Sequence, residues 1–349
     1  MDPTRDTDPP GAPDPLRALN EIAFRLERDL APTFKVRAFR RAAAIVADLG
    51  PAEIRDRVED GRLARTPGIG DRTLQVITQS LEGRVPEYLE RLRRDQESLA
   101  KGGESLLARL RGDLHSHSDW SDGGSSPRLM AETARELGRE YQALTDHSPN
   151  LRVANGLSAE RLESQIALVA ELNESLDGMT LLSGIEVDIL EDGTLDQEAS
   201  LLERLDVVVA SVHSKLRADR ATMTRRMLAG IRDPRTNVLG HCTGRLVAGP
   251  RAPRAASDFD AERVFAACAE HDVAVEINAR PERQDPPDEL IRVALEAGCL
   301  FSIDSDAHAP GQLDFLAYGA ARAEACGVPQ ERIVTTWPLD RLRDWLSAR

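Results

Sequence analysis

The chain has 349 residues and a net charge of −14, with 41% hydrophobic and 30% charged residues. This length allows one large domain and one small domain, and the composition is ordinary for a globular protein. The acidity argues against a nucleic-acid coat protein, and because no apolar run reaches about 18 residues, the sequence predicts no membrane-spanning helix. Four widely spaced cysteines without a CxxC pair predict reduced thiols and a cytoplasmic protein. The sequence leaves the oligomeric state open.

The N-terminal part differs in charge from the rest of the chain. Residues 1–15 are acidic and rich in proline, which predicts a disordered tail. Residues 17–101 carry 17 basic and 14 acidic side chains, whereas residues 102–349 carry 27 and 41. A mildly basic module ahead of an acidic body fits a nucleic-acid-binding arm attached to a metalloenzyme.

Residues 16–100 are predicted to form a small helical domain. Apolar residues recur at helical spacing in stretches between residues 16 and 81, and a charged helix follows at roughly residues 86–99. Residues 101–111, which begin Lys-Gly-Gly-Glu, are the predicted linker to the next domain.

Residues 112–349 alternate between short apolar strands and helical stretches. The expected strands are residues 112–116, 142–146, 180–187, 207–213, 238–241, 273–278 and 300–306. The expected helices include residues 127–137, 159–176, 222–231, 261–271, 288–297 and 315–326. Seven strands with intervening helices predict an α/β fold, a parallel (β/α)7 barrel, in which catalytic groups gather at the C-terminal ends of the strands.

Six of the seven histidines lie in five short motifs at these predicted strand ends. The motifs are Asp-Leu-His115-Ser-His117, Thr-Asp-His147-Ser, Ser-Val-His213-Ser, Gly-His241-Cys-Thr-Gly-Arg and Asp-Ser-Asp-Ala-His308. Imidazole is the commonest transition-metal ligand, so histidines clustered with carboxylates at strand ends indicate a multinuclear metal site.

The spacing within the motifs supports this interpretation. Side chains two residues apart on a strand point to the same face, as in the pairs His115/His117 and Asp306/His308. Glu186 lies in an apolar run, where burial of an unpaired carboxylate is costly unless a cation offsets its charge. Each of these residues taken alone also fits a hydrogen-bonded core residue or a helix cap. Together, at barrel strand ends, they favour a metal centre.

The ordered motif set resembles the polymerase-and-histidinol-phosphatase (PHP) superfamily over residues 112 to about 335. The motifs are Asp-Leu-His-Ser-His, Ser-Asp-Gly, Thr-Asp-His, Gly-Ile-Glu, Ser-Val-His, Gly-His-x-Thr-Gly-Arg, Glu-Ile-Asn and Asp-Ala-His. They are most similar to the PHP domain at the C-terminus of bacterial family X DNA polymerases. The resemblance implies a distorted seven-stranded barrel that holds three divalent metal ions.

The resemblance also implies a role for nine residues. The metal ligands would be His115, His117, Glu186 and Asp306 for the first ion, His213 and His241 with Glu186 as the bridge for the second, and Asp122, His147 and His308 for the third. Glu186, His213 and Asp306 are the expected catalytic members. The mixture of imidazole and carboxylate suits Zn, Mn or Fe. Two neighbouring ions can share a hydroxide nucleophile and bind phosphoryl oxygens, so no Ser or Cys nucleophile is needed.

Three arginines near the motifs are candidates for binding the substrate phosphate. Arg245 ends the Gly-His-Cys-Thr-Gly-Arg motif, and Arg152 and Arg280 follow the second and sixth strands. A surface salt bridge explains each arginine equally well. Asp113 and Asp304 precede predicted ligands by two residues and are expected to orient them.

The turn Pro67-Gly68-Ile69-Gly70 resembles a helix-hairpin-helix, whose glycines let backbone N–H groups approach a DNA phosphate. Residues 17–83, including the basic positions Lys35 and Arg40, are similar to the N-terminal DNA-end-binding domain of family X polymerases. We therefore expect Lys35, Arg40, Gly68 and Gly70 to bind DNA without sequence preference, at ends, gaps or nicks.

Two departures from that family narrow the function. Residues 84–111 are too few to hold the polymerase palm, so this chain should not polymerise. Arg72 and Val76 follow the hairpin where related lyases need a Schiff-base lysine, so lyase activity is not expected.

The sequence thus predicts a trinuclear metal-dependent phosphoesterase that acts on DNA in repair, as a 3′–5′ exonuclease or a 3′-end-processing phosphatase. A small-molecule phosphatase of the histidinol-phosphate type is the alternative enzyme, although such an enzyme has no need of a helix-hairpin-helix. A DNA-binding scaffold without activity is the third possibility, and the intact ligand set argues against it.

Overall fold

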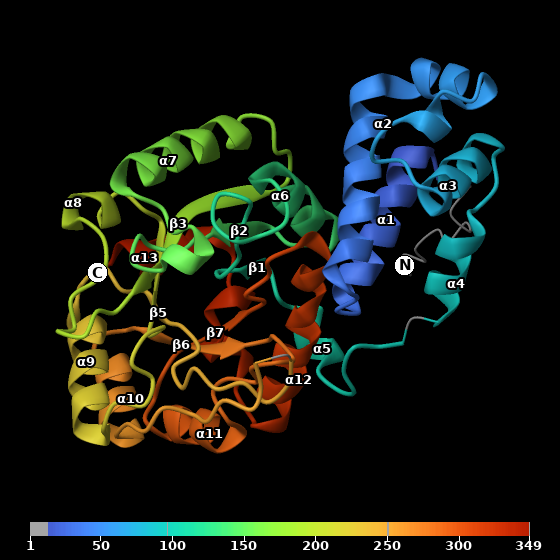
Figure 1. Ribbon diagram of the computed structural model, residues 1–349. Coiled ribbons are helices and arrows are strands. Elements are labelled where there is room, and N and C mark those ends of the chain that lie inside the picture. Colours follow the sequence, from blue (N-terminus) through green and yellow to red (C-terminus); the bar gives the residue numbers. More distant parts are fainter. Residues whose placement is uncertain (1–12, 96, 250, 349) are drawn as a thin grey trace. The chain divides into compact units, whose positions relative to one another are not determined.

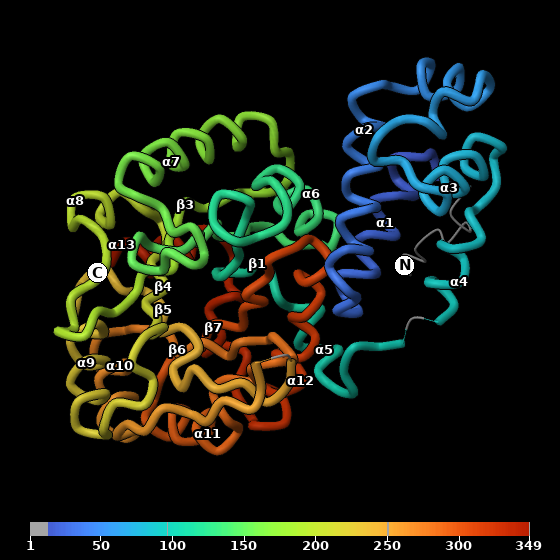
Figure 2. Tube along the Cα trace, viewed as in Figure 1, coloured from blue at the N-terminus to red at the C-terminus, as the bar shows by residue number. Residues whose placement is uncertain are grey.

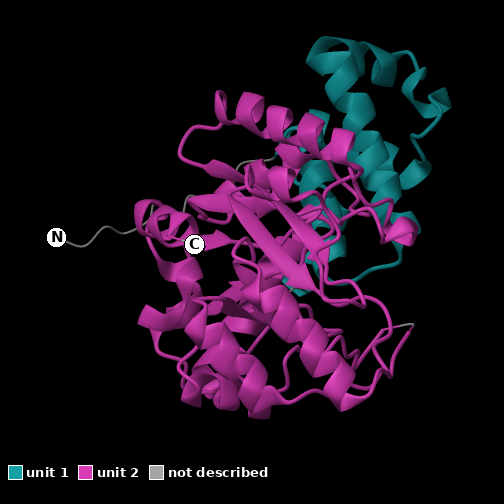
Figure 3. Cartoon of the chain, turned by 90° about the vertical axis from the view of Figure 1, so that its left-hand side faces the viewer, with its two compact units in different colours: residues 1–98 teal, residues 99–349 magenta. Residues whose placement is uncertain are grey.

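The computed structural model describes residues 13–95, 97–249 and 251–348, and the chain divides into two units (Figure 3). We refer to residues 1–98 as the helical unit and to residues 99–349 as the barrel unit. The predicted disordered tail lies outside the described residues except for residues 13–15, and of these Pro15 already belongs to the first helix. In the described ranges, no helix is both long and apolar enough to cross a membrane.

The helical unit packs its elements around one small apolar core. Its described elements are α1 (Pro15–Arg28), α2 (Thr33–Glu59), the 3-10 turn η1 (Leu63–Arg65), α3 (Asp71–Leu81) and α4 (Glu87–Asp95). The fully buried Leu19, Ile22 and Ile77 come from the apolar faces of α1 and α3. Helix α2 covers two predicted helices, which meet at a kink where Gly50 adopts a φ of 73°.

The barrel unit contains one seven-stranded parallel sheet whose strands follow one another in chain order. The strands are β1 (Gly112–Asp113), β2 (Tyr141–Leu144), β3 (Thr180–Asp188), β4 (Val207–Ser211), β5 (Val238–Leu239), β6 (Ala274–Asn278) and β7 (Phe301–Asp304). A parallel bridge between Ser116 and Ala307 joins the two ends of the sheet and closes it into a distorted barrel. The predicted α/β barrel is therefore confirmed.

Helices surround the strands, as the ribbon and the tube show (Figures 1 and 2). They are α5 (Glu104–Leu107), α6 (Pro127–Glu136), α7 (Ala159–Asn173), α8 (Ala199–Leu202), α9 (Arg220–Arg232), α10 (Ala261–Glu270), α11 (Asp288–Glu296), α12 (Leu316–Ala325) and α13 (Leu339–Ser347). Four of these helices begin after a residue whose side chain accepts a backbone N–H of the first turn, namely Ser126, Ser158, Asp219 and Asp260. Short 3-10 turns complete the unit: η2 (Arg152–Ala154), η3 (Pro310–Phe315), η4 (Gln330–Arg332) and η5 (Val334–Thr336).

The two ends of the barrel differ in chemistry. Tyr141, Val207 and Val238, which begin β2, β4 and β5, belong to a buried apolar cluster that also contains Trp337 and Leu342 of the C-terminal segment. At the other end, where the strands finish, the buried side chains are polar and include the histidine motifs. Apolar packing on one side thus leaves the C-terminal strand ends for a polar site.

Most strands end earlier than the sequence predicts. β1 stops at Asp113 instead of residue 116, because the Ser116 N–H bonds the hydroxyl of Thr145 (3.0 Å) instead of a strand carbonyl. The histidine motifs are therefore loop segments that continue from the strands. The short helix α5 lies within the predicted linker of residues 101–111, and α8 and α13 were not expected.

Candidate metal centre

The nine predicted metal ligands all lie at the C-terminal end of the barrel. His115 and His117 follow β1, His147 follows β2, His213 follows β4, His241 follows β5, and Asp306 and His308 follow β7. Glu186 lies within β3, and Asp122 reaches the site from the turn after the first motif. Because parallel strands end on the same side of a barrel, residues more than 190 positions apart in sequence are brought together.

Glu186 lies at the centre of the cluster and is 1% exposed. Its Oε1 lies 2.7 Å from His241 Nε2 and 3.1 Å from His213 Nε2. Its Oε2 lies 2.8 Å from His147 Nδ1, and the Nε2 atoms of His115 and His117 are 3.4 and 3.6 Å away. Burial raises the pKa of the Glu186 carboxyl, but the surrounding histidines outweigh it and hold this pKa well below its usual range.

Asp122 and Asp306 complete the acidic part of the site. Asp122 Oδ1 lies 3.5 Å from His147 Nε2 and 3.4 Å from His308 Nε2. Asp306, which is 1% exposed, lies 3.4 Å from His117 Nε2 through Oδ1. In the described residues, four groups of side chains could each hold one ion, and together these groups contain all nine predicted ligands.

The cluster fits metal ions, because it contains buried nitrogen and oxygen atoms that have no hydrogen-bond partner. These atoms include Nε2 of His115, both ring nitrogens of His117 and His213, Nδ1 of His147 and of His241, and Oε2 of Glu186. Buried polar atoms are normally satisfied, so lone pairs that converge in one buried place indicate cation ligands. Burial also lowers the pKa of His117 well below its usual value, with help from His308 and His147, which keeps that imidazole neutral and able to bind a metal.

Two carboxylates that the sequence analysis did not assign orient the histidines. Glu276, fully buried in β6, places Oε1 2.6 Å from His115 Nδ1, and Asp188 Oδ1 lies 3.3 Å from His213 Nδ1. At His115 the hydrogen bond between Nδ1 and Glu276 fixes the tautomer that leaves Nε2 free for a metal, whereas Asp188 is a charged neighbour of His213. The Glu-Ile-Asn motif contained this signal, since a carboxylate within an apolar strand needs a partner.

The two aspartates that we expected to orient ligands bind the backbone instead. Asp113 Oδ1 accepts the N–H groups of His115 and Ser305, each at 3.2 Å, and Asp304 Oδ1 accepts the N–H of Leu114 at 2.8 Å. Their contacts join the ends of β1 and β7. They therefore position the loops that carry the ligands, and they do not contact the imidazole rings.

The predicted hairpin of the helical unit lies between η1 and α3. Gly68 adopts a φ of +105°, and a Cβ atom there would lie 2.5 Å from Arg41 Nε. Gly70 has no positive φ and open space around it, and its N–H bonds Thr73 Oγ1 at 2.9 Å. The fold thus requires glycine at position 68, whereas it would accept a side chain at position 70.

Comparisons with known proteins agree with this architecture. The sequence matches the PHP domain family over residues 113–280 and the helix-hairpin-helix domain family over residues 10–85. The barrel unit is a PHP domain. The DNA polymerase/3′-5′ exonuclease PolX of Bacillus subtilis is 38% identical over 217 residues, which are 62% of this chain and 37% of that protein.

One further relative and one similar solved structure are phosphatases by name. A probable phosphatase of Aliivibrio fischeri is 29% identical over 238 residues, covering 64% of this chain and 88% of that protein. The histidinol phosphate phosphatase of Lactococcus lactis, solved with zinc, L-histidinol and phosphate, is 19% identical with a TM-score of 0.46, covering 62% of this chain and 94% of that one. In this PHP domain, the clusters of histidine and carboxylate side chains could hold metal ions.

The arginines of the PHP domain have different surroundings. Arg245 donates from Nε to the carbonyl oxygens of Arg283 (3.2 Å) and Gln284 (3.0 Å), so it holds the loop after β6. Arg152 is exposed on η2. Arg280 reaches the ligand cluster through Nη1, which lies 2.8 Å from His308 Nδ1 and 3.0 Å from the carbonyl oxygen of Asp306.

Arg283, which the sequence analysis did not single out, lies closest to the acidic ligands. Its Nε is 3.0 Å from Asp306 Oδ2, and its side chain is only 17% exposed. Burial lowers its pKa, but Asp306 and Glu186 outweigh this and raise the pKa above its usual value, so the guanidinium stays charged. Spacing alone gave no signal for Arg283, because its position depends on the non-regular loop that Arg245 holds.

The basic residues of the helix-hairpin-helix domain also separate into two kinds. Arg40 donates to both carboxylate oxygens of the buried Glu27 (2.8 and 2.7 Å) and to Asn20 Oδ1 (3.0 Å), so its guanidinium is engaged inside the domain. Lys35 and Arg41 are exposed, and Arg41 lies beside Gly68. Arg41 is therefore a better candidate than Arg40 for contact with a phosphate at the hairpin.

Proposed function

We propose that this chain hydrolyses phosphoester bonds at DNA 3′ ends, as a 3′–5′ exonuclease or a 3′-end-processing phosphatase, with three divalent ions held by the nine ligands. The observation that carries the proposal is Glu186, a buried carboxylate contacted by five histidines, in the same chain as a helix-hairpin-helix domain. The name of the Bacillus subtilis relative, which includes a 3′-5′ exonuclease, supports the same assignment.

The ligand side chains define the side from which a substrate approaches. Asp122, His308 and His213 are 36%, 21% and 13% exposed, whereas His115 and His117 are fully buried. When bound, the divalent ions would supply an activated water and neutralise the phosphoryl oxygens. A scissile phosphate therefore enters beside Asp122 and His308.

The chain's own residues provide the remaining functions. Glu276 and Asp188 hold His115 and His213 in fixed orientations. Arg283, with a fixed charge beside Asp306, and Arg280, beside His308, are placed to donate to phosphate oxygens as they arrive. Preorganised donors of this kind stabilise charge that develops on a transferring phosphoryl group.

A small-molecule phosphatase of the histidinol-phosphate type remains the second candidate. It is favoured by the name of the probable phosphatase of Aliivibrio fischeri, because the match covers 88% of that protein and only 37% of the Bacillus subtilis relative. The helix-hairpin-helix domain favours DNA as the substrate, because a metabolite phosphatase has no use for a domain that binds DNA phosphates without sequence preference.

A direct substrate comparison tests the proposal. Protein loaded with Mn or Zn is incubated with 5′-labelled single-stranded, nicked and 3′-phosphate DNA, and in parallel with histidinol phosphate. We expect stepwise shortening of the DNA or release of its 3′-phosphate, and slower turnover of histidinol phosphate. Efficient turnover of histidinol phosphate together with intact DNA would overturn the proposal in favour of the second candidate.

A further inference from the structure

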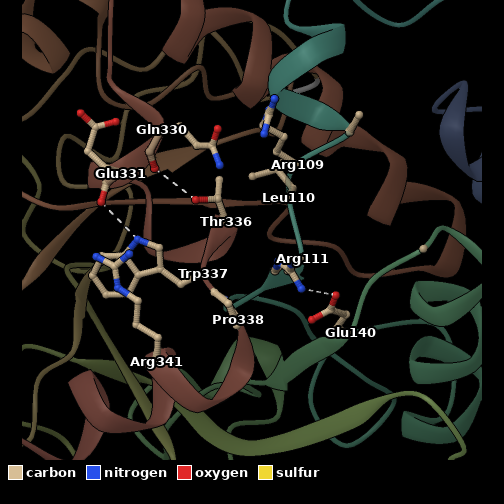
Figure 4. A pocket seen from close by; sticks show the side chains of 12 residues that line it. Arg109, Leu110, Arg111, Glu140, Gln330, Glu331, Thr336, Trp337, Pro338 and Arg341 are labelled. Carbon is tan, nitrogen blue, oxygen red and sulfur yellow. Dashed lines mark hydrogen bonds and ion pairs between the residues drawn. The ribbon is translucent and has the colours of Figure 1, made fainter.

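A cavity of about 700 Å³ is lined by residues that precede β1 and β2 and by residues of the C-terminal segment (Figure 4). It therefore lies at the end of the barrel where the strands begin, whereas the candidate metal centre lies where they finish. Its walls include Arg109 and Arg111, which precede β1, and Glu140, which precedes β2. The C-terminal segment supplies the other wall through Trp337 and Arg341. Because the proposed metal ligands lie in or after the strands, this cavity shares no residue with that centre.

The lining of the cavity has a small excess of positive charge in an otherwise acidic chain. Its lining contains three arginines and two glutamates, namely Arg109, Arg111, Arg341, Glu140 and Glu331. Only Arg111 and Glu140 form an ion pair, at 2.5 Å. Across the described ranges, no carboxylate forms an ion pair with Arg109 or Arg341. One positive charge therefore remains in excess, in a chain whose net charge is −14.

One of the two arginines without an ion pair is held in place by an aromatic ring. The guanidinium carbon of Arg341 lies 3.9 Å from the centroid of the Trp337 ring, and Figure 4 shows the two groups stacked. The Trp337 ring is itself fixed, since Nε1 donates to the carbonyl oxygen of Glu331 (3.1 Å) and the side chain is 6% exposed. Stacking uses the face of a guanidinium and leaves its N–H edge available for an anion.

The backbone around the cavity is also fixed. The Arg111 N–H donates to the carbonyl oxygen of Thr335 (2.8 Å), and the Arg111 carbonyl accepts the N–H of Glu140 (2.6 Å). The Thr336 hydroxyl donates to the carbonyl oxygen of Gln330 (3.1 Å). The cavity is thus formed before any ligand arrives, which lowers the entropic cost of binding.

We propose that this cavity binds a phosphorylated small molecule of about nucleotide size, with Arg109 and Arg341 as its anion contacts. Guanidinium groups donate paired N–H bonds that match phosphate oxygens. The volume exceeds what inorganic phosphate would fill and lies in the range of about 300–1,000 Å³ that is typical of small-molecule sites. Binding here is independent of the phosphoesterase activity proposed for the metal centre.

Calorimetric titration of the full chain with ADP tests the proposal, after treatment with EDTA so that no metal contributes. We expect saturable binding at one site per chain, weakened about tenfold or more in Arg109→Gln and in Arg341→Gln, because each substitution removes a charge-assisted contact. Arg343→Gln is the matched control, because Arg343 is an exposed arginine on the same helix as Arg341 and does not line the cavity. Its affinity should equal that of the unchanged chain.

Other ligands and a stability check complete the experiment. Adenosine should not bind, and pyrophosphate should bind more weakly than ADP. If adenosine or malonate bound as tightly as ADP, the phosphate assignment would be wrong. Arg341→Gln removes a stacking contact and is checked by thermal unfolding, whereas the exposed Arg109 allows the test without that complication. Absence of ADP binding, or binding that neither substitution changes, would refute the site. Either result leaves the metal-centre proposal untouched, because that proposal depends on hydrolysis by the metal-loaded chain.

Discussion

Replacement of Glu276 by glutamine should weaken metal binding without unfolding the barrel. Glu276 Oε1 faces His115 Nδ1 at 2.6 Å, while Oε2 accepts the backbone N–H of His241 at 2.5 Å and the amide of Asn278 at 3.2 Å. A glutamine has one acceptor oxygen in place of two. If its oxygen stays with the His241 N–H, its NH2 group faces His115 Nδ1 and forces the proton onto Nε2, the nitrogen that points toward Glu186.

The size of the effect follows from this tautomer change. Loss of a group that orients a metal-binding histidine typically costs about 10–100-fold in metal affinity, or about 1.4–2.7 kcal/mol. Competition of the metal-free protein with a chromophoric chelator for Zn or Mn measures that affinity directly. Glu289→Gln, an exposed glutamate on α11, is the matched control and should bind metal normally. A Glu276→Gln protein whose metal affinity stays within twofold of the unchanged chain would refute the orienting role.

Three further predictions concern the helix-hairpin-helix domain. Arg40→Ala should lower the free energy of unfolding by about 3 kcal/mol, because it leaves the 3%-exposed Glu27 without this counter-charge. Denaturant titration measures this change, and the control Arg37→Ala, at an exposed position, should leave the free energy of unfolding unchanged. Gly70→Val should weaken DNA binding in a fluorescence-anisotropy titration and keep the melting temperature, because its surroundings are open. Gly68→Val should lower both the DNA affinity and the melting temperature, because of its positive φ and the contact of the new side chain with Arg41. A Gly70→Val protein that binds DNA normally would show that the hairpin is not part of the interface. Arg41→Ala should reduce the slope of log affinity against log salt by about 0.7–0.9 if Arg41 contacts one phosphate, and an unchanged slope would show that it contacts none.

The sequence was sufficient to predict the barrel and the set of residues that converge in it. Histidines placed two residues apart at the ends of apolar segments, such as His115 and His117, indicated the end of the barrel at which the site lies. Strand lengths were less predictable. β1 ends at Asp113, before the predicted residue 116, and the Ser116 N–H donates to the Thr145 hydroxyl, 29 residues away in sequence. Local patterns contain no information about such long-range competition.

The roles of the arginines depended on tertiary structure in the same way. Arg245 looked like a phosphate ligand because it ends a histidine motif, yet its guanidinium bonds the carbonyl oxygens of the loop after β6. Arg283 in that loop lies beside Asp306 instead. Arg40 resembled a DNA contact in a basic helix, but the buried Glu27 on α1 engages it. In each case the residue type was informative and its partner was decided by packing that spacing does not encode.

The measurement that most directly tests the account is the comparison of Glu186→Gln with the unchanged chain. Metal content per chain, hydrolysis of labelled DNA and DNA affinity are measured on the same preparations. Because Glu186 contacts five histidines and lies in the PHP domain, away in sequence from the hairpin, we predict loss of bound metal, a drop in hydrolysis of at least about 100-fold and DNA affinity within a few-fold of normal. A Glu186→Gln protein that keeps its metal and hydrolyses DNA at a near-normal rate would contradict the central role of this carboxylate.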